Sequence, residues 1–241
     1  SLRMRKGISV SPGVAVGTAF CIHEIFVDPD TKRLEDNEVT AELANYETAR
    51  DKTAAELRAL HHKVASQVGT AEAAIFAAHE SILRDAAFTN KVRTWVVNDR
   101  LTAQAALHRL LDEYTVLFSK TNDEYIKERV NDVRDVVIRI SAHLSDVKPE
   151  ENSILSGPVI VVADELLPSQ VVTLGGLEVR GIVTQAGSQT SHAAIIARSR
   201  GIPAISGMRG ILRHVKTGDT IVVDARGGHV LVNPDAEQRS A

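Results

Sequence analysis

The sequence has a single cysteine, Cys21, so no disulfide can form within the chain and a cysteine-ligated metal cluster is excluded. Aromatic residues make up only 4% of the chain, and we therefore expect an interior built mainly from Leu, Val, Ile and Ala. Hydrophobic residues nevertheless reach 44% of the 241 residues, which is enough for one large domain or for two small domains with cores of their own.

Long apolar runs and basic clusters are also missing. No run approaches the roughly 20 residues of a membrane span, and no hydrophobic signal core follows the basic start of the chain. The formal net charge is −3, and no basic cluster is interleaved with aromatic residues. These absences predict a cytoplasmic protein that binds neither membranes nor nucleic acid.

Proline is absent from residues 34–144 but occurs on both sides of this stretch. Within it, apolar residues recur every three or four positions, which predicts amphipathic helices. We expect one long helix with its seam from Val39 to Val64, and further helices at about 71–84, 88–98, 102–119 and 122–144. Thr102 and Asn122 are the expected N-caps of the last two helices. Joined by short connections, these helices should form an antiparallel bundle.

The regions on either side of the helical stretch are rich in β-branched residues, glycine and proline. They predict strands at 159–162, 181–184, 204–206, 220–223 and 229–232, and short helices centred near Val171 and Ile195. Short strands between Gly7 and Glu24 should return to complete the same sheet. The sequence therefore predicts a discontinuous α/β domain, residues 1–30 and 147–236, with a helical subdomain, residues 31–146, inserted into it.

The segment from Gly187 to His192 joins a predicted strand to a predicted helix. Unpaired N–H groups and the positive end of the helix dipole favour an anion at such a junction. Thr190 and Ser191 could cap the helix and donate hydrogen bonds to phosphate oxygens, and Gly187 would let the backbone come close. A neutral imidazole, with its ordinary pKa of about 6.5, is nucleophilic and can form a phosphoramidate. The local pattern thus fits a phosphoacceptor His192, and it fits equally a capping-region histidine in an ordinary βα unit.

Other chemistries are disfavoured at His192. Its neighbours Thr190 and Ser191 diverge from it on a helical turn, so the three cannot form a nucleophile–base pair. No second His, Asp or Glu lies three or four residues from it, which argues against a metal site. Asp164 and Glu165 follow a predicted strand and could orient groups near the site, although solvated loop carboxylates are the commoner outcome.

Glu124, Glu128 and Asp132 form a row of like charges at i,i+4 spacing, which opposes the helix unless cations answer it. A solvated face is one interpretation. We favour a polar network with a neighbouring element, because the row persists over two turns.

Residues 187–198, followed by 201–207, resemble the phosphohistidine signature of enzymes that use phosphoenolpyruvate. Residues 7–17, 74–79, 122–135 and 232–234 resemble the N-terminal domain of enzyme I of the phosphoenolpyruvate-dependent phosphotransferase system, and the resemblance covers nearly the whole chain in one register. It implies an α/β phosphohistidine (swivelling) domain with an inserted all-α helical bundle subdomain. The swivelling domain of a pyruvate phosphate dikinase or phosphoenolpyruvate synthase is the alternative, and the long helical insertion argues against it. A non-catalytic carrier-binding module is another.

The same resemblance implies a function. His192 would take phosphate from phosphoenolpyruvate and pass it to the phosphocarrier HPr or its nitrogen-branch relative. Phosphoenolpyruvate and Mg²⁺ would bind a C-terminal domain that lies outside this sequence, and no cofactor is expected within it. Carrier docking maps onto five residues of the helical subdomain: Ala74, Ile75, His79, Ile82 and Arg129.

Two departures from the sugar-branch pattern lean toward a nitrogen-type or divergent carrier. Where sugar-branch enzymes have acidic residues around the docking surface, this chain has Ala71, Ala77, Ala86 and Ala87. Where they have a threonine that can hydrogen-bond the active histidine, it has Val171. Fewer interfacial charges should weaken electrostatic steering of a basic carrier.

Overall fold

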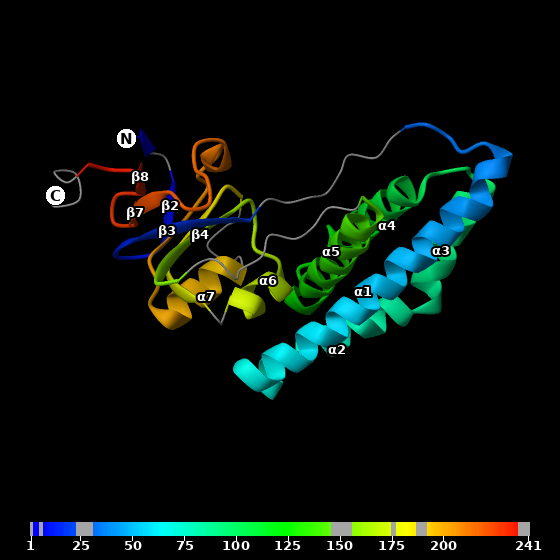
Figure 1. Ribbon diagram of the computed structural model, residues 1–241, viewed down its shortest axis with the longest axis horizontal. Helices are drawn as coiled ribbons and strands as arrows, with labels where there is room; N and C mark the ends of the chain where they lie inside the picture. The colour runs from blue at the N-terminus through cyan, green and yellow to red at the C-terminus, as the bar shows by residue number, and fades with distance from the viewer. Residues whose placement is uncertain are drawn as a thin grey trace. The chain divides into compact units, whose positions relative to one another are not determined.

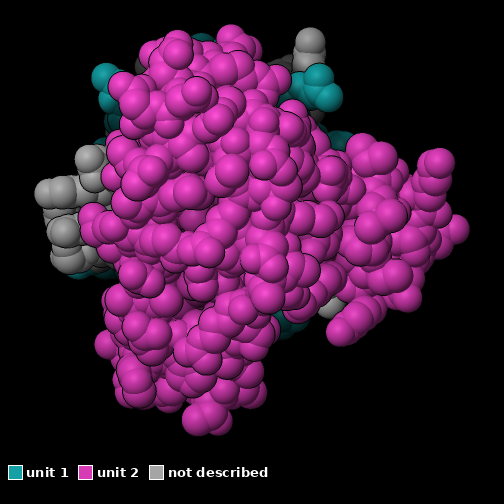
Figure 2. Space-filling model, turned by 90° about the vertical axis from the view of Figure 1, so that its right-hand side faces the viewer, with its two compact units in different colours: residues 1–24, 150–241 teal, residues 25–149 magenta. Residues whose placement is uncertain are grey.

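The computed structural model describes residues 2–4, 7–22, 31–145, 156–174, 177–186 and 192–235. The chain forms two compact units, one of residues 1–24 with 150–241 and one of residues 25–149 (Figure 2). Both connections between the units, and with them the predicted boundaries near residues 30 and 147, fall in segments outside the described residues. The boundaries therefore stay predictions.

Residues 25–149 form the helical unit (Figure 1). Its elements are η1 (Asp36–Glu38), α1 (Val39–Gln67), α2 (Thr70–Arg84), α3 (Ala86–Asn98), α4 (Ala103–Phe118) and α5 (Glu124–Leu144). Helix α1 packs mainly on α2 and α5, and α4 packs on α5. The predicted helices are confirmed, and their positions agree with the apolar periodicity. No helix in the described part of the chain is both long enough and apolar enough to span a membrane.

The helix caps agree with the sequence at one of the two predicted positions. Thr102 caps α4, because its side chain accepts a hydrogen bond from Ala105 N at 3.1 Å. The prediction that Asn122 caps α5 is wrong by one residue: Asp123 Oδ1 accepts from Tyr125 N at 3.0 Å. A carboxylate also interacts favourably with the positive end of the helix dipole, which a neutral Asn does not.

The core of the helical unit is mainly aliphatic, as the scarcity of aromatic residues predicts. Val133, Val137 and Ile140 on the seam of α5 are buried. Ala73, Ala103 and Ala106 are completely buried, and such small side chains allow neighbouring helices to approach closely. Among the aromatic residues that the structure describes in this unit, Tyr46, Phe76 and Phe88 are fully enclosed.

The α/β unit is built on an eight-stranded mixed sheet in the order β1-β8-β7-β3-β4-β5-β6-β2. The strands are β1 (Leu2–Met4), β2 (Ile8–Ser11), β3 (Val14–Ile22), β4 (Pro158–Ala163), β5 (Glu178–Thr184), β6 (Ala204–Ser206), β7 (Thr220–Asp224) and β8 (His229–Val232). Strand β3 runs parallel to β4 on one side and antiparallel to β7 on the other. The N-terminal segment therefore does return to complete the sheet, as predicted.

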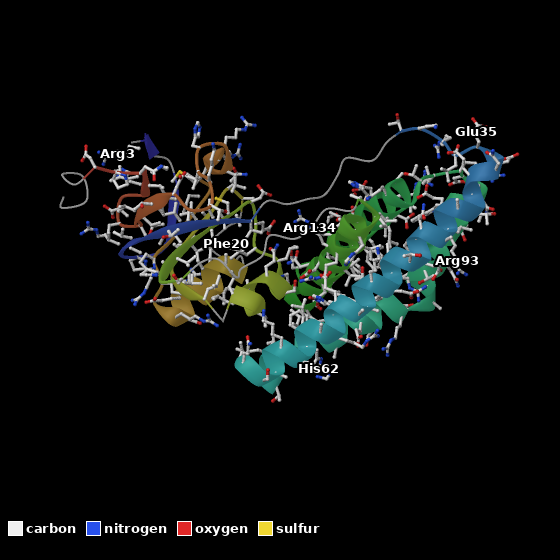
Figure 3. The ribbon with its side chains drawn as sticks, viewed as in Figure 1. Arg3, Phe20, Glu35, His62, Arg93 and Arg134 are labelled. Atoms are coloured by element: carbon white, nitrogen blue, oxygen red, sulfur yellow. The ribbon has the colours of Figure 1, made fainter. Side chains whose placement is uncertain are left out.

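The sheet is covered on both faces. Val159, Val161 and Ala163 of β4 belong to one apolar cluster, together with residues of α6 (Pro168–Thr173) and α7 (His192–Arg200). Ile160 and Val162 belong to the other cluster, which also contains Ile211 of η4 (Ile211–Arg213). All five of these β4 residues are 0% exposed, which explains why this central strand is a continuous apolar run rather than an alternating one. Phe20 of β3 lies in the same cluster as α6 and α7 (Figure 3).

Candidate functional site

The candidate site lies where the parallel strands end. Strands β3, β4 and β5 run in one direction, so their carboxyl ends, Ile22, Ala163 and Thr184, lie at one edge of the sheet. Helix α6 follows β4, and α7 follows β5. Ligands of open α/β sheets commonly bind at this edge.

His192 is the first residue of α7, as the sequence pattern predicts. Gly187, Thr190 and Ser191 precede it in a segment that lies outside the described residues, as does the side chain of His192. The positive end of the α7 dipole coincides with this position. The proposed roles of these four residues therefore stay predictions.

Small buried residues fix the first turn of α7 against the sheet. Ala193 and Ala194 are 4% and 0% exposed, and they share an apolar cluster with Val171 of α6 and with Leu174. Val171 therefore offers this turn an aliphatic surface and no hydroxyl group. Arg198 and Arg200 lie in the last turn of the helix, where cations complement the negative end of the dipole.

The hydrogen bonds of Gln185, which we call the Gln185 clamp, hold the chain just after β5, where the connection to α7 begins. Gln185 Nε2 donates to Asp164 Oδ1 at 3.0 Å, and Gln185 Oε1 accepts from Leu212 N at 3.0 Å. The backbone continues the β4–β5 pairing one step further, with Gln185 N donating to Ala163 O at 3.0 Å and Ala186 N to Asp164 O at 2.9 Å. Asp164 is thus half-buried and bonded, and the expectation of a solvated loop carboxylate is wrong for it.

Two buried hydroxyl groups join the ends of β5 and β6. Thr184 Oγ1 donates to Ser206 Oγ at 3.1 Å, and Met208 N donates to Thr184 O at 3.0 Å. Sequence reasoning missed both this pair and the Gln185 clamp. The sequence did show polar residues at the ends of predicted strands, next to a turn typical of anion-binding sites. It could not show their hydrogen-bond partners, because these are distant in the sequence.

The five predicted docking residues divide between the surface and the core of the helical unit. Ala74 of α2 and Arg129 of α5 are exposed, and Ile75 is half-buried. His79 is completely buried and Ile82 is 3% exposed. In this structure, any effect of His79 or Ile82 on docking acts through the packing of α2.

His79 belongs to a polar contact between helices. Its Nε2 lies 3.0 Å from Asp132 Oδ1 of α5, and its buried Nδ1 has no hydrogen-bond partner among the described residues. Asp132 is a member of the predicted acidic row, so this residue does face a neighbouring helix. The side chains of Glu124 and Glu128, the other members of the row, lie outside the described residues.

A second polar network joins α1 and α5. Glu56 accepts from Arg139 and lies 2.6 Å from His143 Nε2. Asp135, with a side chain only 1% exposed, lies 3.5 Å from Arg139 Nε. These contacts support an inter-helix network on the polar side of α5.

A metal site does not emerge from the described residues. Among them, no group of three His, Cys, Asp or Glu side chains lies close enough together to hold a metal ion.

The two units together define a protein of the phosphoenolpyruvate (PEP)-utilising class. The family model described as PEP-utilising enzyme, N-terminal, matches residues 6–129, and that of the PEP-utilising enzyme mobile domain matches residues 155–228. The chain belongs to the PEP-utilising enzyme family.

Curated relatives narrow this class. The chain is 36% identical over 232 residues to a phosphoenolpyruvate-protein phosphotransferase of Staphylococcus carnosus, and the match covers 96% of this chain and 40% of the relative. The corresponding Haemophilus influenzae protein is 32% identical over 235 residues, with 98% of this chain and 41% of the relative covered. The chain thus spans about 40% of the length of the relatives that it matches.

Solved structures confirm the predicted fold class. An NMR solution structure of Enzyme I (nEIt) superposes with a TM-score of 0.80 at 35% identity, covering 98% of this chain and 96% of that chain. A structure described as the N-terminal domain of Enzyme 1 - Nitrogen gives a TM-score of 0.57 at 25% identity with the same coverage. The α/β phosphohistidine domain with an inserted helical bundle is therefore the fold of this chain.

Proposed function

We propose that this chain is the phosphohistidine and carrier-binding part of a phosphoenolpyruvate-protein phosphotransferase. One observation carries the proposal: two models of PEP-utilising enzymes match the chain in order, at residues 6–129 and 155–228, and a relative named phosphoenolpyruvate-protein phosphotransferase matches 96% of it. His192, at the start of α7, is the proposed phosphoacceptor. Thr190, Ser191 and Gly187 are proposed to stabilise the phosphate oxygens.

The proposed reaction is a balanced exchange between two imidazoles. A ring nitrogen of His192 attacks the phosphorus of a phosphorylated carrier histidine, forming one N–P bond as the other breaks. The carrier imidazole leaves with the bonding electron pair, and one proton passes from His192 to that imidazole. In the forward direction the same step runs in reverse and loads the carrier.

The dipole of α7 supports phosphorylation at this position. A phosphoryl group at a helix N-terminus gains about 0.3–1 kcal/mol from the dipole when exposed. The burial of Ala193 and Ala194 fixes the first turn, so the dipole does not have to reorient during transfer. The helix therefore favours the phosphorylated form without a cofactor in this chain.

The proposed carrier is HPr or a nitrogen-branch relative, which would dock on the outer face of α2 and on α5. Ala74 and Arg129 are exposed there, and Ile75 is half-buried. Ala71 and Ala77 lie beside Ala74 on the exposed side of α2, so this face is mostly small and uncharged. Docking should accordingly depend on apolar contact more than on salt-sensitive steering. Phosphoenolpyruvate and Mg²⁺ are proposed to bind outside this chain, and the cytoplasm is the proposed location.

Phosphate exchange with a phosphorylated HPr-type carrier tests the proposal. Wild-type chain should take up acid-labile, alkali-stable phosphate, and His192→Ala should take up none. His62→Ala, which changes an exposed histidine of α1 (Figure 3), is the matched control and should behave as wild type. Phosphate uptake by His192→Ala would refute the assignment, and carrier binding without any phosphorylation would identify a non-catalytic carrier-binding module instead.

A further inference from the structure

The side chain of Gln185 joins three segments at the point where β5 leaves the sheet. Its amide donates to Asp164, which follows β4, and accepts from the backbone of Leu212 in η4, both at 3.0 Å. Its own backbone N–H donates to Ala163 O at 3.0 Å. The end of β4, the end of β5 and η4 are thereby tied together through one residue.

The chemistry of this bridge requires an amide. Asp164 presents a carboxylate oxygen, so the group facing it must donate, while the Leu212 N–H requires an acceptor. Glutamine meets both demands at once. A glutamate would place a second carboxylate about 3 Å from the first, and two such groups cannot both ionise without mutual repulsion. A leucine at position 185 would leave the half-buried Leu212 N–H and the Asp164 carboxylate oxygen without these hydrogen-bond partners.

The Gln185 bridge lies just before residues 187–191, the segment that leads to His192. Ala186, the next residue, donates its backbone N–H to Asp164 O at 2.9 Å. The backbone is therefore hydrogen-bonded as far as Ala186, the last described residue before this segment. After this segment, Ala193 and Ala194 are packed into the core. Because the described backbone on both sides of residues 187–191 is held in place, we expect His192 to be presented in a narrow range of positions, and phosphoryl transfer depends steeply on such alignment.

We propose that Gln185 is a positioning residue for phosphoryl transfer at His192, acting as an amide bridge between the Asp164 carboxylate and the Leu212 N–H. The inference rests on the proposed function. It assigns Gln185 no contact with the phosphoryl group: the residue acts through the backbone that leads to His192.

Exchange of the two polar partners provides the test. Gln185→Glu sets two carboxylates against each other, whereas the double variant D164N/Q185E rebuilds the donor–acceptor pair in reverse. In the double variant the introduced asparagine amide donates to the introduced glutamate, whose carboxylate still accepts from Leu212 N. The double variant also keeps the charge of the wild-type pair. The rate of His192 phosphorylation is measured with phosphoramidate, a small donor that releases ammonia and needs no docking surface, and with a phosphorylated HPr-type carrier.

With both donors, Gln185→Glu should slow phosphorylation at least about tenfold, and D164N/Q185E should return the rate to within about a factor of three of wild type. Thermal unfolding of each variant is recorded in parallel, and the rates are compared at a temperature below its unfolding transition. A rate that recovers in the double variant then reports the position of His192 rather than the stability of the fold. If Gln185→Glu fails to fold, the double variant alone decides: a folded double variant that stays at least about tenfold slow overturns the proposal. So does a folded Gln185→Glu variant with the wild-type rate.

Gln104 supplies the matched control. Its amide makes an analogous bridge in the helical unit, donating to Ser141 O at 2.9 Å and to Ser145 Oγ at 2.8 Å. Gln104→Glu should lower thermal stability and leave the phosphoramidate rate unchanged. A Gln104→Glu rate as low as that of Gln185→Glu overturns the special role of Gln185. Failure of wild-type chain to be phosphorylated at His192 would instead refute the proposed function itself.

Discussion

The two units of the chain place their buried polar residues differently. Among the described residues of the helical unit they lie within helices: Thr53 in α1, His79 in α2, Thr89 in α3, and Asp135 and Ser141 in α5. In the described part of the α/β unit they lie at the ends of elements: Ser11, Thr184 and Ser206 end strands, and Ser169 lies in the first turn of α6. Polar contacts thus fix how helices pair in one unit, and they fix the edge that carries the candidate site in the other.

The contrast reflects two ways of fixing the register between neighbouring elements. Strand β4 is hydrogen-bonded on both sides by its neighbours, so its backbone is satisfied and its side chains can all be aliphatic. A bundle of smooth aliphatic helices could pair in several registers, whereas contacts such as His79 with Asp132 favour one of them.

The largest predicted effect would break the α/β unit alone. Val161→Asp in β4 introduces a charge at a fully buried site and should cost more than about 4 kcal/mol, enough to unfold this unit. Because each unit has its own core, the amide NMR resonances of residues 31–145 should keep their native positions. Val16→Asp, at a β3 side chain that is 46% exposed, is the control and should leave both units folded. Collapse of the spectrum of both units in Val161→Asp would show that they do not fold separately.

The second prediction addresses the polar network of the helical unit. Arg139→Met removes the cation beside the buried Asp135 and should destabilise this unit by about 3 kcal/mol. Arg93→Met breaks an ion pair between Glu47 and an arginine side chain that is 51% exposed (Figure 3), and it should cost less than about 1 kcal/mol. Urea unfolding of the two variants measures the difference. Equal losses would contradict the assignment of the Arg139 network to the interior.

The third prediction concerns the buried Tyr46 of α1 and the pH dependence of stability. Burial raises the pKa of Tyr46 to about 12, from an ordinary value of 10.0. The folded state holds the phenol proton more tightly than the unfolded state does. The resulting contribution of Tyr46 to the free energy of unfolding is therefore complete below about pH 10 and is lost as the pH rises toward 12. The loss reaches about 2–3 kcal/mol.

Urea unfolding of wild type and Tyr46→Phe between about pH 8 and 11.5 tests this prediction. The free energy of unfolding of wild type should fall more steeply above pH 10 than that of the variant, which lacks the phenol. Parallel curves would mean that Tyr46 does not carry the alkaline dependence.

Much of the fold could be predicted because its signals are local. Apolar spacing from Val39 to Val64 fixes α1, and the β-branched runs fix β4 and β5. The same periodicity could have placed His79 correctly, since it shares the buried stripe of α2 with Phe76 and Leu83. Local pattern could not choose between Asn122 and Asp123 as a cap, because both side chains offer an acceptor.

The site was only partly predictable, for a physical reason. His192 is marked by its own turn and helix. Gln185 is marked by nothing nearby, because its role depends on Asp164 and Leu212, which are 21 and 27 residues away in the chain. Contacts at such separation follow from the order of strands in the sheet, and that order is settled by the whole fold.

Peptide mapping of the phosphorylated chain decides whether His192 is the reversible phosphoacceptor. Chain loaded from a phosphorylated HPr-type carrier is digested under alkaline conditions, which preserve phosphohistidine, and the phosphate is located by tandem mass spectrometry. We expect one major phosphopeptide, with the phosphoryl group on His192, and we expect it to disappear when unphosphorylated carrier is added in excess. Stoichiometric phosphate on another residue, or phosphate on His192 that the carrier cannot remove, would contradict it.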